Sequence, residues 1–373
     1  MEDPIFDKVL EFNPKSFPLM INRHDLLLNE VKTCLINIDK HQKLNYVIVS
    51  LSGGVDSISL MHCLFQLQSE FNYKIIAGHV NYNNREETHI EQKFLERWCD
   101  IFNITIHVLN ITQFKRGITN RKDYEDQTKI LRYDFYKELL LKYPSCGIFI
   151  GHHSNDLAEN VFTNIMNGRD ILDLSVIVKT STVLQVPIIR PFVNIYKKNI
   201  FDFAHKHYIP YFIDTTPDWS NRGILRRVIF EQLGKHYGDS FQNNLVRIGN
   251  MSEDWNQIIK DKIITPFWNK ILFNSYGAVF DISKYSNYPL CFWKTILREI
   301  HHHMSLPQPS NKSILNFINT LNNGKKEGFI SLKHNTLCFY SNNIYLIYKK
   351  ILLPSIHDVN FLKETVQKTF IVK

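Results

Sequence analysis

Short apolar runs alternate with longer amphipathic stretches along the first half of the chain. The run 46–51 is β-branched and almost free of polar residues, as expected for a strand that is buried on both faces of a parallel sheet. Apolar residues near helical spacing predict a helix over 24–41. The same reasoning predicts strands at 74–80, 104–109 and 147–151, and helices at 56–68, 86–102, 124–142 and 155–167. This alternation indicates an α/β fold with a doubly wound, mostly parallel, Rossmann-like sheet.

The pattern changes after residue 191. Helices are predicted at 196–208 and 224–236, followed by a largely helical stretch over 241–300 and by short strands at 329–332, 336–340 and 344–348. We therefore expect four regions, namely an N-terminal extension without clear periodicity (1–23), an α/β domain (24–237), a helical domain (238–306) and a small C-terminal α+β region (307–373).

Composition narrows the class of protein. The 373 residues include 44 Lys or Arg and 36 Asp or Glu, a net charge of +8 that favours a polyanionic partner such as RNA. The six cysteines are scattered without a CxxC pair, which argues against a zinc ribbon, an iron–sulfur site or a disulfide scaffold. Residues 1–19 are acidic and do not resemble a leader peptide, and no uncharged apolar stretch reaches membrane-spanning length. We expect a soluble, cytoplasmic protein with no membrane partner.

The sharpest chemical signal is the string SGGVDS directly after the predicted strand 46–51. It consists of Ser52, Gly53, Gly54, Val55, Asp56 and Ser57. Two glycines let the backbone turn tightly around an anion, and the next helix begins there with its positive end. The lysine of a Walker A loop is missing, and an acid beside phosphates is unfavourable without a cation, so Asp56 implies Mg²⁺. An ordinary helix cap is the alternative, but the strand–turn–helix setting favours a nucleotide site.

A second polar cluster follows the predicted strand 147–151 and contains His152, His153, Asp156 and Glu159. The two acids lie three residues apart at the start of a helix, so both carboxylates point the same way. Helix capping would explain the acids alone. Two acids beside two histidines at the carboxyl end of a strand are better suited to Mg²⁺ binding and to the positioning of a base.

These strings resemble those of a known family. SGGVDS matches the SGGxDS loop of the ATP pyrophosphatases, or PP-loop enzymes, which cut ATP into AMP and pyrophosphate. GHHSNDLAEN (151–160) resembles the HHxxDxxET string of the tRNA(Ile)-lysidine synthases, with Asn160 in place of Thr. HVNYNNR (79–85) and EDQTKILRY (125–133) resemble the HV(N/D)HGLR and ExxARxxRY strings of that family, with Tyr82 and Lys129 as departures. The resemblance covers about residues 46–248.

Weaker matches lie downstream. IRPF (189–192) resembles the family's IRPL string, and YFIDTTP (211–217) resembles its EDPSN loop, with Pro217 near the position of the Asn. SNRGILRR (220–227) resembles its RNRIR string. Arg222 and Arg226 are therefore candidate contacts to phosphate or to an adenylate.

The resemblance implies a reaction that uses ATP and Mg²⁺. The wobble cytidine of tRNA(Ile) with a CAU anticodon is adenylated as pyrophosphate leaves, and free lysine then displaces AMP to form lysidine. The implied metal ligands are Asp56, Asp156 and Glu159, and the implied catalytic residues are these three with Arg222 and Arg226. The implied nucleotide-binding residues are the loop 52–57 with His79, Asn81, Arg132, His152 and His153.

Two alternatives stay open. A tRNA 2-thiolation enzyme shares the loop and the adenylate, but it needs a cysteine pair that Cys63, Cys99 and Cys146 do not provide by spacing. A catalytically degraded ATP- or RNA-binding protein would explain departures such as Tyr82 and Lys129. No pattern in the sequence indicates the oligomeric state.

Overall fold

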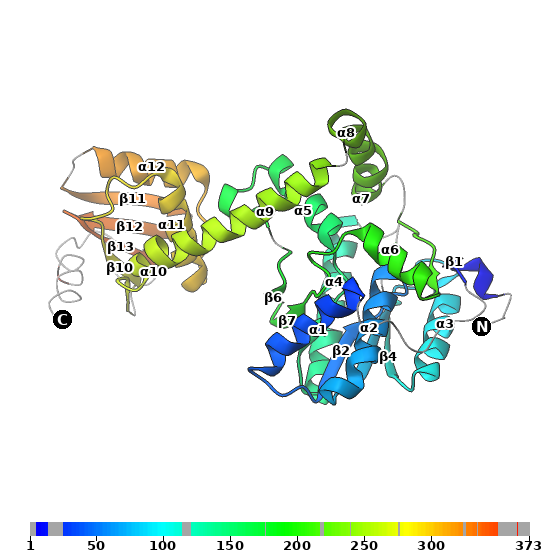
Figure 1. The fold of residues 1–373 in the computed structure, drawn as a ribbon. Coiled ribbons are helices and arrows are strands. Elements are labelled where there is room, and N and C mark those ends of the chain that lie inside the picture. Colours follow the sequence, from blue (N-terminus) through cyan, green and yellow to red (C-terminus); the bar gives the residue numbers. More distant parts are fainter. Residues whose placement is uncertain are drawn as a thin grey trace. The chain divides into compact units, whose positions relative to one another are not determined.

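The computed structural model describes residues 5–13, 25–113, 121–175, 177–216, 220–238, 240–274, 277–323, 326–333, 335–349 and 364. The chain divides into two compact units, Met1–Glu253 and Asp254–Lys373, and each is described by itself (Figure 1). In the described part of the chain, no helix is both long and apolar enough to cross a membrane.

The first unit is built on a six-stranded sheet with the order β4-β3-β2-β5-β7-β6. All neighbours are parallel except β6 and β7, which form an antiparallel hairpin at one edge. The strands are β2 (Tyr46–Ser50), β3 (Lys74–Asn81), β4 (Thr105–Asn110), β5 (Ser145–Phe149), β6 (Thr180–Val183) and β7 (Val186–Ile189). The predicted α/β fold with a mostly parallel sheet is confirmed, whereas the β6–β7 hairpin was not predicted.

Helices cover both faces of this sheet (Figure 1). The helices between residues 26 and 206 are α1 (Leu26–Asp39), α2 (Val55–Phe71), α3 (Thr88–Ile101), α4 (Arg121–Lys142), α5 (Ser154–Met166), the short 3-10 helix η2 (Ile171–Asp173) and α6 (Lys197–Lys206). Val47 and Val49 of β2 belong to the core formed with α1, α2, α3 and α6, while Ile48 belongs to the core formed with α4. Because side chains alternate along a strand, the three central residues Val47, Ile48 and Val49 are all apolar and fill both cores.

Part of the predicted N-terminal extension joins the first core. A 3-10 helix η1 (Phe6–Lys8) leads into β1 (Leu10–Phe12), which pairs with β8 (Tyr211–Phe212). Phe6 is buried edge-on against Phe94 of α3. The extension therefore contributes a strand, although its sequence shows no period, because a three-residue strand is too short to display one.

The first unit ends in a helical region. The short helix α7 (Asn221–Ile224) continues through a π-helical turn η3 (Leu225–Ile229) into α8 (Phe230–Tyr237), and α9 (Ser240–Ile259) crosses the boundary between the units. Gly238 separates α8 from α9 with a φ of +73°, a conformation that favours glycine.

The second unit packs helices on an antiparallel sheet with the order β11-β12-β13-β10-β9. Its elements are the π-helical turn η4 (Lys260–Ile264), α10 (Thr265–Trp268), β9 (Leu272–Phe273), β10 (Gly277–Asp281), α11 (Leu290–His303), α12 (Asn311–Asn322), β11 (Glu327–Lys333), β12 (Thr336–Ser341) and β13 (Ile344–Lys349). The prediction of a helical stretch over 241–300 is wrong at β9 and β10. Ala278 and Phe280 face the core around Trp293, and Val279 faces the opposite side, so burial on both faces hid the alternation of a strand. The predicted helical region 238–306 thus shares one sheet with the predicted C-terminal region.

Candidate active site

The loop between β2 and α2 is a closed turn held by its own last residue. The hydroxyl Oγ of Ser57 accepts the backbone N–H groups of Ser52 (3.1 Å) and Gly53 (3.0 Å) and donates to the carbonyl oxygen of Gly54 (3.1 Å). The N–H groups at the start of α2 have no acceptor within the helix. The turn therefore presents the positive end of α2 at the carboxyl edge of the sheet.

Phe212 of β8 fixes the shape of this turn from the side. Gly53 has a φ of +90°, and a Cβ atom at this position would lie 2.0 Å from the ring of Phe212. The backbone N–H of Phe212 donates to the carbonyl oxygen of Gly53 (2.9 Å). Only glycine fits position 53, for reasons of both conformation and space. No local signal in the sequence points to Phe212.

Gly151 brings the second predicted cluster against the same turn. A Cβ atom on Gly151 would lie 2.9 Å from the backbone of Asp56, so the segment after β5 can approach the turn only without a side chain. The ring Nε2 of His153 lies 3.7 Å from Oδ1 of Asp56 and 3.4 Å from Oδ2 of Asp156. The structure therefore unites the two clusters that the sequence analysis predicted separately.

Two buried acids and two arginines form a compact ion-paired group. Asp156 and Glu159 on α5 are only 7% and 6% exposed. Arg222 of α7 donates from Nε to Glu159 (3.0 Å) and from Nη2 to Asp156 (3.1 Å). Arg226 of η3 donates from Nε to Glu159 and from Nη2 to Asp156 (3.3 Å). Four of the five predicted catalytic residues are thus in direct contact, and the fifth, Asp56, lies beside His153.

The environment sets the charges in this group. Burial alone would raise the pKa of Asp156, but His153, Arg222, His152 and the backbone N–H of His153 together hold it below the usual value. Burial lowers the pKa of His153 and lowers that of His152 to about 4. At neutral pH the acid is therefore ionised and both histidines are neutral.

Arg190 fixes the tautomer of His152. Its guanidinium Nε–H donates to Nδ1 of His152 (3.1 Å), and its Nη1 donates to Ser181 (2.8 Å) and to the carbonyl oxygen of Val178 (2.9 Å). Since Nδ1 accepts this hydrogen bond, the neutral ring carries its proton on Nε2. Arg190 lies in the IRPF string, but the sequence analysis did not assign it to the site.

Lys197 is a site residue that the sequence analysis missed. Its Nζ contacts both carboxylate oxygens of Asp56, at 2.7 and 2.6 Å. The two residues are 141 positions apart, and lysine at the start of α6 is unremarkable in the sequence, so no local pattern reveals the pair. Asn155 of α5 accepts the backbone N–H of Lys197 (2.9 Å) and so ties α6 to the site.

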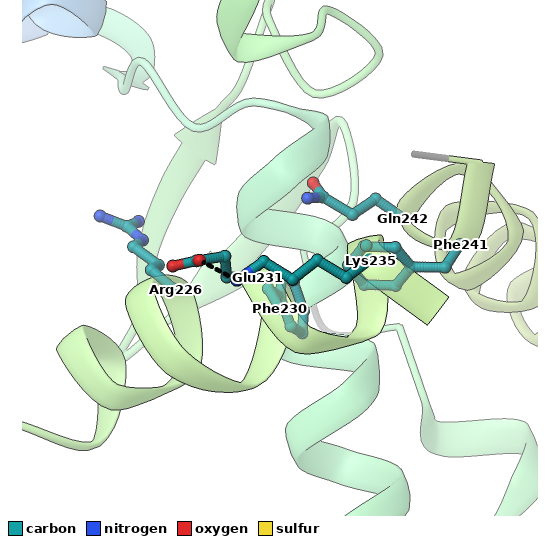
Figure 2. A pocket seen from close by; sticks show the side chains of 7 residues that line it. Arg226, Phe230, Glu231, Lys235, Phe241 and Gln242 are labelled. Atoms are coloured by element: carbon teal, nitrogen blue, oxygen red, sulfur yellow. Dashed lines mark hydrogen bonds and ion pairs between the residues drawn. The ribbon is translucent and has the colours of Figure 1, made fainter. Parts of the chain in front are cut away.

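A cavity of about 520 Å³ adjoins the arginine side of the site (Figure 2). Its lining comprises Arg226, Phe230, Glu231, Gly234, Lys235, Phe241 and Gln242. Gln242 of α9 is hydrogen-bonded to Asn155, which lies next to Asp156 in the chain. Arg226 therefore belongs both to the lining of the cavity and to the ion-paired group.

Comparison with known proteins identifies the domain that carries this site. A family model described as a PP-loop domain matches residues 27–233, just over half of the chain. The chain belongs to the PP-loop family.

The chain is similar to curated tRNA(Ile)-lysidine synthases over part of their length. A tRNA(Ile)-lysidine synthase from Clostridium tetani is 32% identical over 194 residues, which are 52% of this chain and 40% of that protein. One from Streptococcus agalactiae is 32% identical over 217 residues, 57% of this chain and 46% of that protein. The match thus spans less than half the length of these curated relatives. Among solved structures, a U34-tRNA thiolase from Methanococcus maripaludis aligns with a TM-score of 0.46 and 18% identity, over 60% of this chain and 79% of that chain.

Within the PP-loop domain, His79 and Asn81 are bound to the protein itself. The buried ring of His79 uses Nδ1 to contact the carbonyl oxygen of Leu51 (2.8 Å), just before the loop. Asn81 donates to Gln92 (2.9 Å) and accepts the backbone N–H of Asn83 (2.9 Å). Their contacts support the loop and the end of β3, so direct binding of a nucleotide by these two side chains stays a prediction.

Arg132 of α4 lies among three tyrosines of the PP-loop domain. Its guanidinium carbon is 5.4 Å from the ring centre of Tyr133. Burial alone would lower the pKa of Arg132, but Tyr82, Tyr136 and Tyr133 hold it above the usual value. Tyr136 in turn contacts Ser50 at the end of β2 (2.7 Å). The departure at Tyr82 therefore places a ring where it can contact the predicted nucleotide-binding arginine.

The three predicted metal ligands do not form one cation site in this structure. The oxygens of Asp156 and Glu159 already accept hydrogen bonds from Arg222 and Arg226. Among the residues that the structure describes, no group of three His, Cys, Asp or Glu side chains lies close enough together to bind one metal ion. Asp56 fits as a single ligand, because Mg²⁺ at nucleotide sites takes one or two carboxylates and completes its shell with phosphates and water.

Proposed function

We propose that this chain is an ATP-dependent tRNA-modifying enzyme of the tRNA(Ile)-lysidine synthase type. In this proposal it adenylates the wobble cytidine of tRNA(Ile) with a CAU anticodon and ligates free lysine to it, releasing pyrophosphate and AMP. The observation that carries the proposal is the contact of one glycine-rich turn, through His153, with a group of two buried acids and two partly exposed arginines. The names of the relatives that match this half of the chain support the same reaction.

The turn is suited to bind the phosphates of ATP. Gly53 and Gly54 leave the backbone open, and the first turn of α2 offers N–H groups and the positive end of a helix. A Mg²⁺ ion held by Asp56 would neutralise part of the phosphate charge. The adenylation then forms a bond between the cytidine 2-oxygen and the α-phosphorus and breaks the bond to the pyrophosphate.

Arg222 and Arg226 are placed to stabilise the transferring phosphate. Their guanidinium groups are held by Asp156 and Glu159, and their side chains remain 53% and 32% exposed. Fixed donors of this kind act most strongly where charge develops in the transition state. The two acids thus serve first to orient the arginines.

The amine step requires a proton acceptor. The ε-amine of lysine attacks carbon 2 of the cytidine, the bond from carbon 2 to the adenylate oxygen breaks, and AMP leaves. The amine must lose a proton, and the candidate acceptors are Asp56 and Asp156. Asp156 is the weaker acceptor, because Arg222 and the backbone N–H of His153 stabilise its ionised form. Asp56 therefore remains the proposed acceptor.

Buried thiols argue against thiolation. Burial raises the pKa of Cys34 to about 11 and that of Cys99 to about 12, and burial and Asp25 also raise the pKa of Cys63. A thiol acts as a nucleophile only as thiolate, so these three groups are inert at neutral pH.

Mass spectrometry of nucleosides tests the proposed reaction. The tRNA(Ile) with a CAU anticodon is incubated with ATP, Mg²⁺, lysine and the protein, then digested. The expected product is a cytidine adduct with the mass of lysine. Pyrophosphate release should require tRNA, and it should continue beyond one turnover only when lysine is also present. Binding of ATP and tRNA without any turnover would instead support the degraded binding protein. A sulfur-containing nucleoside formed with a sulfur donor would support the thiolation enzyme.

A further inference from the structure

Lys197 and Asp56 form an ion pair at the mouth of the phosphate turn. The Lys197 Nζ contacts both carboxylate oxygens of Asp56. These are the oxygens that would bind Mg²⁺ in the proposed function. We propose that Lys197 is a phosphate-binding residue that pairs with Asp56 before the nucleotide binds and transfers to the β- or γ-phosphate when it does. This inference rests on the proposed function, because it takes ATP as the ligand.

The pair is accessible to a ligand and can separate. The side chains of Lys197 and Asp56 are 30% and 26% exposed. The ammonium group lies 5.2 Å from the ring centre of Phe201, and its four-carbon stem allows several directions. Because both side chains remain partly in contact with solvent, water screens the pair and lowers the cost of separating it.

The surroundings favour an anion beside Lys197. Three helices of at least ten residues, α2, α5 and α6, begin around the pair, and Lys197 is the first residue of α6. The positive ends of these helices attract negative charge. The nearby acids Asp156 and Glu159 are paired with Arg222 and Arg226. In the described structure, Lys197 is paired with a single acid, Asp56, which is the proposed metal ligand.

The transfer follows from competition for Asp56. A divalent cation that arrives with ATP binds the carboxylate more strongly than an ammonium group does, because it is a hard doubly charged ion that prefers oxygen ligands. The released ammonium group then lies next to phosphate oxygens that carry excess negative charge. Lysine commonly binds phosphate as a point charge of this kind.

Nucleotide binding to two neighbouring lysine variants tests the proposal. Lys197→Met is compared with Lys198→Met, which removes the same charge from an exposed position next to it. Affinities for AMP and for an ATP analogue with a methylene bridge between the α- and β-phosphates are measured calorimetrically with Mg²⁺. We expect Lys197→Met to weaken binding of the analogue about ten- to a hundredfold and that of AMP less than twofold. Lys198→Met should leave both unchanged.

A double variant separates phosphate binding from support of Asp56. If Lys197 contacts phosphate, Lys197→Met should still weaken analogue binding in an Asp56→Asn background. No further loss in that background, or an equal loss for AMP, would overturn the proposal. Far-UV circular dichroism and thermal unfolding confirm that each variant is folded. If the unaltered protein binds neither the analogue nor ATP, the proposed function fails; if it binds and Lys197→Met binds equally well, only this inference fails.

Discussion

The ring of Phe212 fills the space that any side chain at position 53 would need. This contact joins β8 to the phosphate turn, although the two residues are far apart in the sequence. The width of the turn is therefore set by a strand at the edge of the domain, and β1 holds that strand by pairing with it.

Replacement of Gly53 by Ala should disrupt the turn. A Cβ atom would meet Phe212 at 2.0 Å, and the φ of +90° disfavours any residue but glycine. We expect Gly53→Ala to lower the free energy of unfolding by roughly 2 kcal/mol or more and to abolish ATP binding. Gly54→Ala is the matched control, because a Cβ atom there meets only Ser52 Oγ, at 3.7 Å. Equal stability of the two variants would contradict the role given to Phe212.

The geometry of Arg226 should matter as much as its charge. Arg226→Lys keeps a positive charge but cannot contact Asp156 and Glu159 with the same planar fork. We expect a loss of about a hundredfold in the rate of tRNA-dependent pyrophosphate release. The control is Arg169→Met, which removes an exposed arginine paired with Asp173 on the surface. A rate for Arg226→Lys within twofold of the unaltered protein would remove Arg226 from the catalytic group.

His62 should make the stability of the protein depend on pH. Burial, and to a smaller extent His207, lowers the pKa of His62 from 6.5 to about 4. The folded state therefore keeps this ring neutral, and between pH 6.5 and about 4 only the unfolded chain takes up the proton. Stability is complete above pH 6.5 and falls as the pH drops through this window. At pH 5 the loss from this residue is about 2 kcal/mol relative to neutral pH.

Urea unfolding at pH 5 and pH 7.5 measures this effect. His62→Leu removes the titrating ring while keeping an apolar side chain between Phe65 and Phe102. The variant should lose less stability on acidification than the unaltered protein, by about 2 kcal/mol. Parallel pH profiles for the two proteins would show that His62 does not contribute.

Phe6 should stabilise the first unit from outside the matched PP-loop region. Its ring is buried against Phe94, so Phe6→Ala should lower the free energy of unfolding by about 3–5 kcal/mol. Ile5→Ala, at a neighbouring exposed position, serves as the control and should change stability by less than about 0.5 kcal/mol. A Phe6→Ala protein as stable as this control would show that Phe6 does not stabilise the first unit.

The sequence predicted those features of the fold and the site whose residues are neighbours in the chain. β2 and the turn after it were found because a buried strand, two glycines and a helix start lie in one continuous string. Lys197 and Phe212 were missed because their partners Asp56 and Gly53 are distant in the chain, and a pairwise contact of this kind leaves no periodic signal.

Turn chemistry explains a further miss. The β6–β7 hairpin turns at Leu184 and Gln185, which have φ values of +46° and +68°. Two-residue hairpins with such angles usually contain Asn or Gly, so the residues Leu and Gln do not predict a turn at this position. Similarly, β10 lies between helices in a stretch whose buried apolar residues suit either element, and only its pairing with β13 decides for a strand.

The pairing of β10 with β13 has a consequence for biosynthesis. Residues 277–281 leave the ribosome long before residues 344–349, so β10 cannot pair with β13 until the later strand has been synthesised. During that interval one side of β10 displays unsatisfied N–H and C=O groups next to apolar side chains, a combination that invites association with other nascent chains. Slow translation between these two strands would prolong the hazard, and a chaperone that shields the early strand would shorten it.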